Sequence, residues 1–130
     1  MTRILIDTNV YSAFKRNHEV VREEIRSADL IGISAIVLAE LYSGFRLGSK
    51  ERKNIKELDE FMEDPRVEAL PFIRHTAFFY ARIFGNLKKN ATPIPTNDIL
   101  IAASAIEHGL ELLSFDRHFE KIEGLAFRMP

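Results

Sequence analysis

Four acidic residues occupy positions where a negative charge is costly: Asp7, Glu40, Asp98 and Asp116. Asp7 and Asp116 each follow a short apolar run, and Asp98 begins a long apolar stretch. Glu40 lies within Ile36–Tyr42, where every other residue is apolar, and no basic residue stands three or four positions away. An unpaired carboxylate in such surroundings costs several kcal/mol. Glu40 therefore needs a neutralising partner from elsewhere in the fold.

Carboxylates of this kind can share a cation. Two unit charges about 4 Å apart repel by about 4 kcal/mol at an effective dielectric constant of 20, so acids that meet have raised pKa values unless a cation lies between them. Oxygen ligands suit the hard ions Mg²⁺ and Mn²⁺. The chain has no cysteine, and no histidine stands at ligand spacing, which disfavours zinc. We therefore expect one or two Mg²⁺ or Mn²⁺ ions among these four carboxylates.

Each acid also has a purely structural interpretation. Asp7 and Asp98 stand where an acid can cap a helix, which stabilises the helix by about 1 kcal/mol, and Asp116 fits a turn. Glu40 has neither a cap nor a local partner, so its structural alternative is an ion pair with a distant arginine. A structure that shows such a pair, or that places the four acids on separate faces, would exclude the metal site.

The remaining residues predict the elements that position these acids. Short apolar runs indicate strands at residues 3–6, 30–33, 67–72 and 111–114, with an edge strand at 126–128. Helices are expected at residues 10–16, 19–27, 35–42, 50–63 and 76–89. A last helix begins at Asn97 or Asp98 and ends at Gly109, and Gly44 is expected to end the helix that carries Glu40.

Short buried strands that alternate with helices predict an α/β fold, in which a short central parallel sheet has helices on both faces. Groups that follow the carboxyl ends of such strands meet in one crevice. Asp7 and Asp116 are therefore expected to meet there, joined by Glu40 and Asp98 from the intervening helices. The 130 residues contain no repeat or linker, so we expect a single domain, 1–130.

Composition limits the classes of function. The chain has 18 Lys and Arg against 19 Asp and Glu, a net charge of −1, whereas proteins that bind nucleic acid through phosphates alone are normally basic. If a metal neutralises the four acids, the rest of the chain carries +3, which suits a polyanion. No apolar run approaches the ~20 residues of a membrane span, and the stretch before Asp7 is too short for a signal-peptide core. We therefore expect a cytoplasmic protein without membrane contact.

Four short motifs span nearly the whole chain. They are Leu5–Val10; Ser34, Glu40, Leu41 and Gly44; Asp98 and Ile101–Ala103; and Ser114, Asp116, His118, Phe119, Ile122, Gly124 and Leu125. In this order they resemble the motifs of PIN domains, and the length of the chain suits the VapC-type toxins of bacterial and archaeal toxin–antitoxin pairs. Ser114 stands where many members carry threonine, and it keeps the hydroxyl group.

The resemblance implies a Mg²⁺- or Mn²⁺-dependent endoribonuclease that hydrolyses RNA phosphodiester bonds. It also implies a homodimer, held inactive by a cognate antitoxin whose basic side chain enters the acidic site. We expect Asp7 and Asp98 as direct metal ligands, and Asp116 as a ligand of a second ion or one that acts through water. Glu40 is expected to orient a water molecule or to act as a base.

Further residues have supporting roles in this hypothesis. Those expected to orient the ligands are Asn9, Ser114 and, with a weaker signal, Thr8. Those that could meet RNA phosphates, or simply form a solvated face, are Lys15, Arg16 and Arg46. Four aromatic residues could stack on bases, but their helical spacing favours core or dimer contacts; these are Phe78, Phe79, Tyr80 and Phe84.

Other functions fit the sequence less well. A metal-free ribonuclease would use imidazole groups as acid and base, but the four histidines are scattered and share no motif. A haloacid-dehalogenase-like phosphatase needs aspartate where this chain has Asn9, and a receiver domain needs a lysine near Ser114–Asp116. A catalytically silent PIN-like module that binds RNA or a protein partner remains the alternative, although all four acids are present.

Overall fold

The computed structural model describes all residues from Met1 to Pro130. Its centre is a five-stranded sheet in which every neighbouring pair of strands is parallel. The strand order is β3-β2-β1-β4-β5. The strands are β1 (Arg3–Ile6), β2 (Leu30–Ser34), β3 (Val67–Leu70), β4 (Glu111–Leu113) and β5 (Phe127–Arg128).

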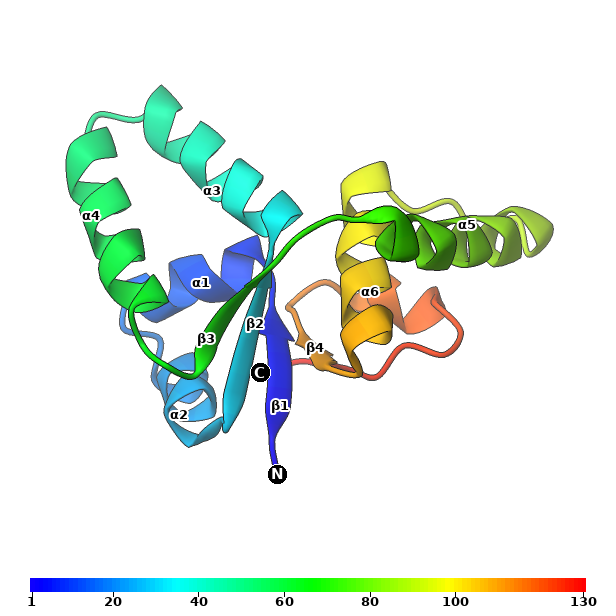
Figure 1. Cartoon of the computed structure of the whole chain (residues 1–130), viewed down its shortest axis with the longest axis horizontal. Coiled ribbons are helices and arrows are strands. Elements are labelled where there is room, and N and C mark those ends of the chain that lie inside the picture. Colours follow the sequence, from blue (N-terminus) through cyan, green and yellow to red (C-terminus); the bar gives the residue numbers. More distant parts are fainter.

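Helices fill the connections between the strands. They are α1 (Thr8–Lys15), α2 (Glu19–Ser27), α3 (Ala35–Leu47), α4 (Glu51–Met62), α5 (Arg74–Lys89), α6 (Thr96–His108) and the 3₁₀ helix η1 (Arg117–Lys121). The path β1-β2-β3 runs in one direction across the sheet, and α5 and α6 return the chain to β4 on the other side of β1. Because parallel crossovers are right-handed, α1–α4 and α5–α6 lie on opposite faces (Figure 1). The predicted α/β architecture is confirmed.

Strand β1 occupies the centre of the core. Ile4, Leu5 and Ile6 are fully buried, because β1 has a paired strand on either side and helices above and below. Ile6 pairs with Leu113 of β4, so the residues that follow these two strands emerge at the same edge of the sheet. The crossovers on either side of β1 lie on opposite faces, and this is the position where open α/β sheets form their ligand crevice.

The prediction that Gly44 ends its helix is wrong. Helix α3 continues through Gly44 to Leu47 and is followed by Gly48. A glycine inside a helix costs about 1 kcal/mol relative to alanine and does not by itself force the left-handed turn that ends a helix. The packing of Val37 and Leu41, both buried, holds the first turns of α3 against the core.

Smaller differences have local causes. Strand β3 ends at Leu70 rather than at residue 72, because Pro71 has no N–H group to donate to the ladder. Val20 is 51% exposed, so the buried face of α2 consists of Val21 and Ile25. No helix combines the length and the apolar character needed to span a bilayer.

Alanine is expected to have opposite effects at two of the glycines. Gly109 ends α6 with φ at 65°, a conformation in which a Cβ atom costs about 1–2 kcal/mol. A Cβ atom at Gly44 meets no atom within 4 Å. At this second position alanine stabilises the helix by about 1 kcal/mol relative to glycine. Calorimetry should show Tm lowered by roughly 3–10 °C in Gly109→Ala and raised by roughly 3–5 °C in Gly44→Ala. A lowered Tm in Gly44→Ala would contradict the continuous α3.

Candidate metal centre

Asp7 joins β1 to α1. Its Oδ1 atom accepts a hydrogen bond from the N–H of Val10 at 3.1 Å and so caps α1, while its Oδ2 atom accepts the hydroxyl of Ser114 at 2.5 Å. The Ser114 hydroxyl also accepts the N–H of Asp116 at 3.0 Å. Only 7% of Asp7 is exposed. The cap and the candidate ligand are therefore the same side chain, and Ser114 fixes its position from β4.

Glu40 is held by two neutral donors. The hydroxyl of Thr8 donates to Oε1, and the Nδ2 atom of Asn97 donates to Oε2 at 3.3 Å. Glu40 takes part in no ion pair, so the alternative of a distant arginine is wrong. Neither donor removes the negative charge of the carboxylate. Sequence reasoning did not identify Asn97, although its position directly before Asp98 at the start of a helix was a usable signal.

His118 lies between the other two acids. Its Nε2 atom is 2.8 Å from Oδ2 of Asp98, and its Nδ1 atom is 3.0 Å from Oδ1 of Asp116. One ligand atom from each of these three residues lies within 4.8 Å of the others. The statement that no histidine has ligand spacing is therefore wrong, because α6 and η1 bring residues 98 and 118 together in a way that their separation along the chain does not reveal.

The structural interpretations of the aspartates hold only in part. Asp116 caps η1 by accepting the N–H of His118 at 3.1 Å, as the predicted turn would require. Asp98 does not cap α6, because the N-cap position is Pro95 and Asp98 lies in the first turn. An acid near a helix N-terminus is still favoured by the helix dipole, but Asp98 is not needed to start this helix.

All four predicted acids line one small pocket at the carboxyl edge of the sheet. Its volume is about 210 Å³. It is lined by Asp7, Thr8, Asn9, Glu40, Asp98, Ile101, Asp116 and Phe119. No lysine or arginine is among these residues, so the pocket gathers negative charge without a permanent cation of its own.

Burial and, to a smaller extent, the neighbouring negative charges raise the pKa values of two carboxyls in this pocket. Burial raises the pKa of Asp7, and the charges of Asp98 and Glu40 raise it further, against the lowering effect of the Ser114 and Val10 hydrogen bonds. Burial also raises the pKa of Asp98, with Asp116 and Glu40 adding to the rise and His118 opposing it. Both shifts have the sign expected where acids are held together without a cation.

This donor set fits a hard divalent cation. Asp7, Asp98 and Asp116 present carboxylate oxygens to one pocket, as Mg²⁺ and Mn²⁺ prefer. His118 adds one imidazole beside Asp98 and Asp116, a ligand more typical of Zn²⁺, Fe²⁺ and Ni²⁺, to a set in which carboxylates predominate. A divalent ion would offset the repulsion that raises the pKa values of Asp7 and Asp98.

The predicted basic contacts and the remaining histidines lie elsewhere. Lys15 pairs with Glu57 at 3.2 Å and Arg46 with Glu51 at 3.8 Å, whereas Arg16 forms no ion pair. The histidines outside the pocket have structural neighbours: His18 caps α2, and His75 and His108 flank Glu107. With one histidine at the pocket, an imidazole acid–base pair cannot be assembled there.

The raised pKa of Asp7 predicts a pH dependence of stability. Folding takes up protons wherever the folded pKa exceeds the unfolded one, so the contribution of Asp7 to the free energy of unfolding falls as the pH rises above about 4. In a chelator, the Tm of Asp7→Asn minus that of the parent should therefore grow between about pH 4.5 and pH 7. A difference that is constant over this range would contradict the assignment.

Comparison with known proteins agrees with this geometry. The family model described as PIN domain matches residues 4–125. The chain belongs to the PIN domain family. Ribonuclease VapC1 of Rickettsia felis is 38% identical to this PIN domain over 125 residues, which cover 94% of this chain and 92% of the relative. The tRNA(fMet)-specific endonuclease VapC of Salmonella typhimurium is 28% identical over 128 residues, 96% of each chain.

Solved structures place this PIN domain beside the same relatives. A structure described as DNA-bound VapBC from Salmonella typhimurium superposes with a TM-score of 0.86 and 28% identity, and the match covers 99% of this chain and 98% of that one. The resemblance in the four sequence motifs therefore extends to the whole fold. The chain spans nearly the full length of these relatives.

Proposed function

We propose that this PIN domain is a Mg²⁺- or Mn²⁺-dependent endoribonuclease and the toxin of a toxin–antitoxin pair. The observation that carries the proposal is the meeting of Asp7, Glu40, Asp98 and Asp116 in one pocket that contains no lysine or arginine. Relatives that match over nearly the whole chain are ribonucleases by name. Because these relatives are named as enzymes that cut RNA, they support RNA as the substrate class of this chain.

The residues of the pocket have separate roles in this proposal. Asp7, Asp98 and Asp116 hold one or two ions, with His118 beside the last two. A divalent ion held by these residues would supply a Lewis acid to activate water and to stabilise the leaving oxygen of the phosphodiester. Glu40 orients or deprotonates the attacking water, since Thr8 and Asn97 fix its two oxygens. Ser114 holds Asp7 in its rotamer, and Asn9 lines the pocket.

The proposal includes a protein partner. An acidic pocket that lacks its own cation can accept a lysine or arginine from another chain, which would occupy the place of the metal and block cleavage. We propose a cognate antitoxin that acts in this way on a homodimer in the cytoplasm. The VapBC assembly among the similar structures supports an association with a second protein.

Cleavage of RNA by the purified chain tests the proposal. Cleavage of total RNA is expected with Mg²⁺ or Mn²⁺, and none after full chelation, with recovery when the ion is restored. Activity that survives chelation would exclude the metal mechanism. Binding of RNA without cleavage under any of these ions would instead favour the catalytically silent module, for which Arg16 and the acid-free helix α5 supply cations.

A further inference from the structure

The charge of the chain is unevenly distributed. Residues 69–97 contain no acidic residue but four permanent cations, whereas the whole chain has a net charge of −1; this segment therefore carries +4 and the rest −5. The four cations all lie on α5 and are exposed: Arg74, Arg82, Lys88 and Lys89. None of them forms an ion pair. Helix α5 thus presents uncompensated positive charge.

Aromatic rings accompany this charge. Phe84 is 47% exposed, and Phe78 is 59% exposed, while Ile83 and Leu87 form the buried face of α5. The rings of Phe84 and Tyr80 are stacked, with centroids 6.1 Å apart and planes inclined by 15°. Of the two expected roles, core or dimer contact, the core role is therefore wrong for Phe78 and Phe84; the dimer contact stays a prediction.

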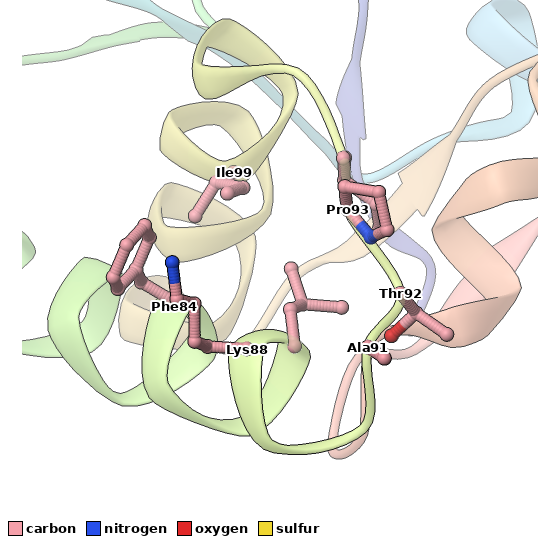
Figure 2. Close-up of a pocket in the computed structure, with 8 residues that line it drawn as sticks. Phe84, Lys88, Ala91, Thr92, Pro93 and Ile99 are labelled. Atoms are coloured by element: carbon pink, nitrogen blue, oxygen red, sulfur yellow. The ribbon is translucent and has the colours of Figure 1, made fainter.

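Phe84 and Lys88 open onto a pocket. Its volume is about 430 Å³, within the usual range for small-ligand sites. Figure 2 shows Phe84 and Lys88 rising from α5, Pro93 on the loop across from them, and Ile99 on α6. The walls are apolar, and the polar groups are the Lys88 ammonium and the loop residue Thr92. An apolar slot with one ring and one cation at its edge suits a flat base attached to a phosphate.

The pocket adjoins the candidate metal centre through the first turns of α6. Asp98 lines the acidic pocket, and Ile99, the next residue of α6, lines the pocket beside Phe84 from a different side of the helix. Asn97, one residue earlier, donates to Glu40. A strand of RNA whose phosphate lies among the acids reaches α5 by passing around this first turn of α6, which separates the two pockets.

We propose that the pocket between α5 and α6 is a nucleotide subsite for single-stranded RNA, next to the bond that is cut. A base stacks on Phe84, and Lys88 binds a flanking phosphate; the inference rests on the proposed ribonuclease function. A second copy of this chain is a poorer occupant, because a two-fold contact through α5 would place its four cations against themselves. Any base can stack on an aromatic ring. The subsite therefore positions the RNA strand and does not select a base sequence.

Binding by a cleavage-deficient chain tests the subsite directly. In an Asp7→Asn background, fluorescence anisotropy with a labelled single-stranded RNA should give a Kd raised roughly 10-fold by Phe84→Ala. Lys88→Ala should lower the slope of log Kd against log salt by about 0.7, the loss of one phosphate contact. The matched controls, Phe78→Ala and Lys89→Ala, lie outside the pocket. If Phe84→Ala and Phe78→Ala raise the Kd equally, RNA binds the exposed aromatic surface of α5 without using the pocket, and the proposal is overturned.

Single abasic sites in the RNA locate the occupied position. With the parent chain, one abasic site near the cut should raise KM roughly 10-fold with kcat little changed, and in Phe84→Ala the same site should have no further effect. If the parent cuts RNA but no abasic position couples to Phe84, the subsite is wrong and the nuclease stands. If the parent never cuts, the proposed function fails. If Phe84→Ala instead converts a dimer to a monomer in light scattering, α5 is an interface between copies, and the proposal is overturned.

Discussion

Replacing Asp7 with asparagine is expected to lower metal-dependent RNA cleavage by at least about 10³-fold, equivalent to about 4 kcal/mol of transition-state stabilisation. Asp7 is the most buried of the four acids, and it is held by hydrogen bonds from both Val10 and Ser114. The substitution removes its charge from the cation site while the side chain keeps nearly the same shape. The measurement is the initial rate of cleavage at saturating Mg²⁺ or Mn²⁺.

The same variant should be at least as stable as the parent in a chelator near neutral pH. Burial disfavours the charged form of Asp7, and asparagine can still accept the Val10 N–H. Loss of activity together with a lowered Tm would therefore indicate misfolding rather than loss of a ligand. Asp59→Asn, at an exposed acid on α4, is the matched control and should leave the rate unchanged. A rate within about tenfold of the parent in Asp7→Asn would remove Asp7 from the metal centre.

Arg66→Ala is expected to cause the largest loss of stability from a residue outside the core, about 2 kcal/mol. The Nη1 atom of Arg66 donates to the carbonyls of Ile25, Arg26 and Ala28 at 3.0, 3.1 and 2.9 Å. These carbonyls end α2, where backbone acceptors have no partner within the helix and the helix dipole favours a cation. The second half of the guanidinium pairs with Asp64.

Thermal denaturation measures this effect, and a Tm lowered by roughly 6–10 °C is expected. Arg26→Ala is a suitable control, because Arg26 is 76% exposed and its only side-chain partner is Glu23 on the same helix; such pairs contribute about 0.5 kcal/mol or less. The metal centre is far from Arg66 along the sheet, so the cleavage rate below the transition temperature should remain that of the parent. A similar loss of Tm in both variants would show that the carbonyl contacts do not anchor α2.

Local patterns in the sequence predicted which acids meet in one pocket. Asp7 stands out because it ends a short apolar run, and Glu40 because its helical neighbours offer no compensating charge. Parallel strands bring such residues to one edge of the sheet, so their meeting followed from the predicted fold. Gly109 likewise ends α6 as predicted, with the positive φ that glycine tolerates.

Contacts between distant segments were not predictable in the same way. Two contacts have no periodic pattern in the sequence: His118 with Asp98, and Asn97 with Glu40. The packing of α3, α6 and η1 determines both contacts. The exposure of Phe84 was missed for the opposite reason. Its helical spacing fits a buried stripe, but Ile83 and Leu87 occupy that stripe one residue away, and periodicity alone does not distinguish neighbouring faces of a short helix.

The pairing of β1 with β4 has a consequence for synthesis of the chain. Residues 4–6 pair with residues 111–113, and Asp7 takes its hydroxyl donor from Ser114. A polypeptide still emerging from the ribosome therefore lacks one wall of the acidic pocket until residues 111–116 have emerged. In the proposed nuclease, the acidic pocket is therefore incomplete until β4 has emerged and folded onto β1, and an inhibitor already present can meet each copy as the pocket forms.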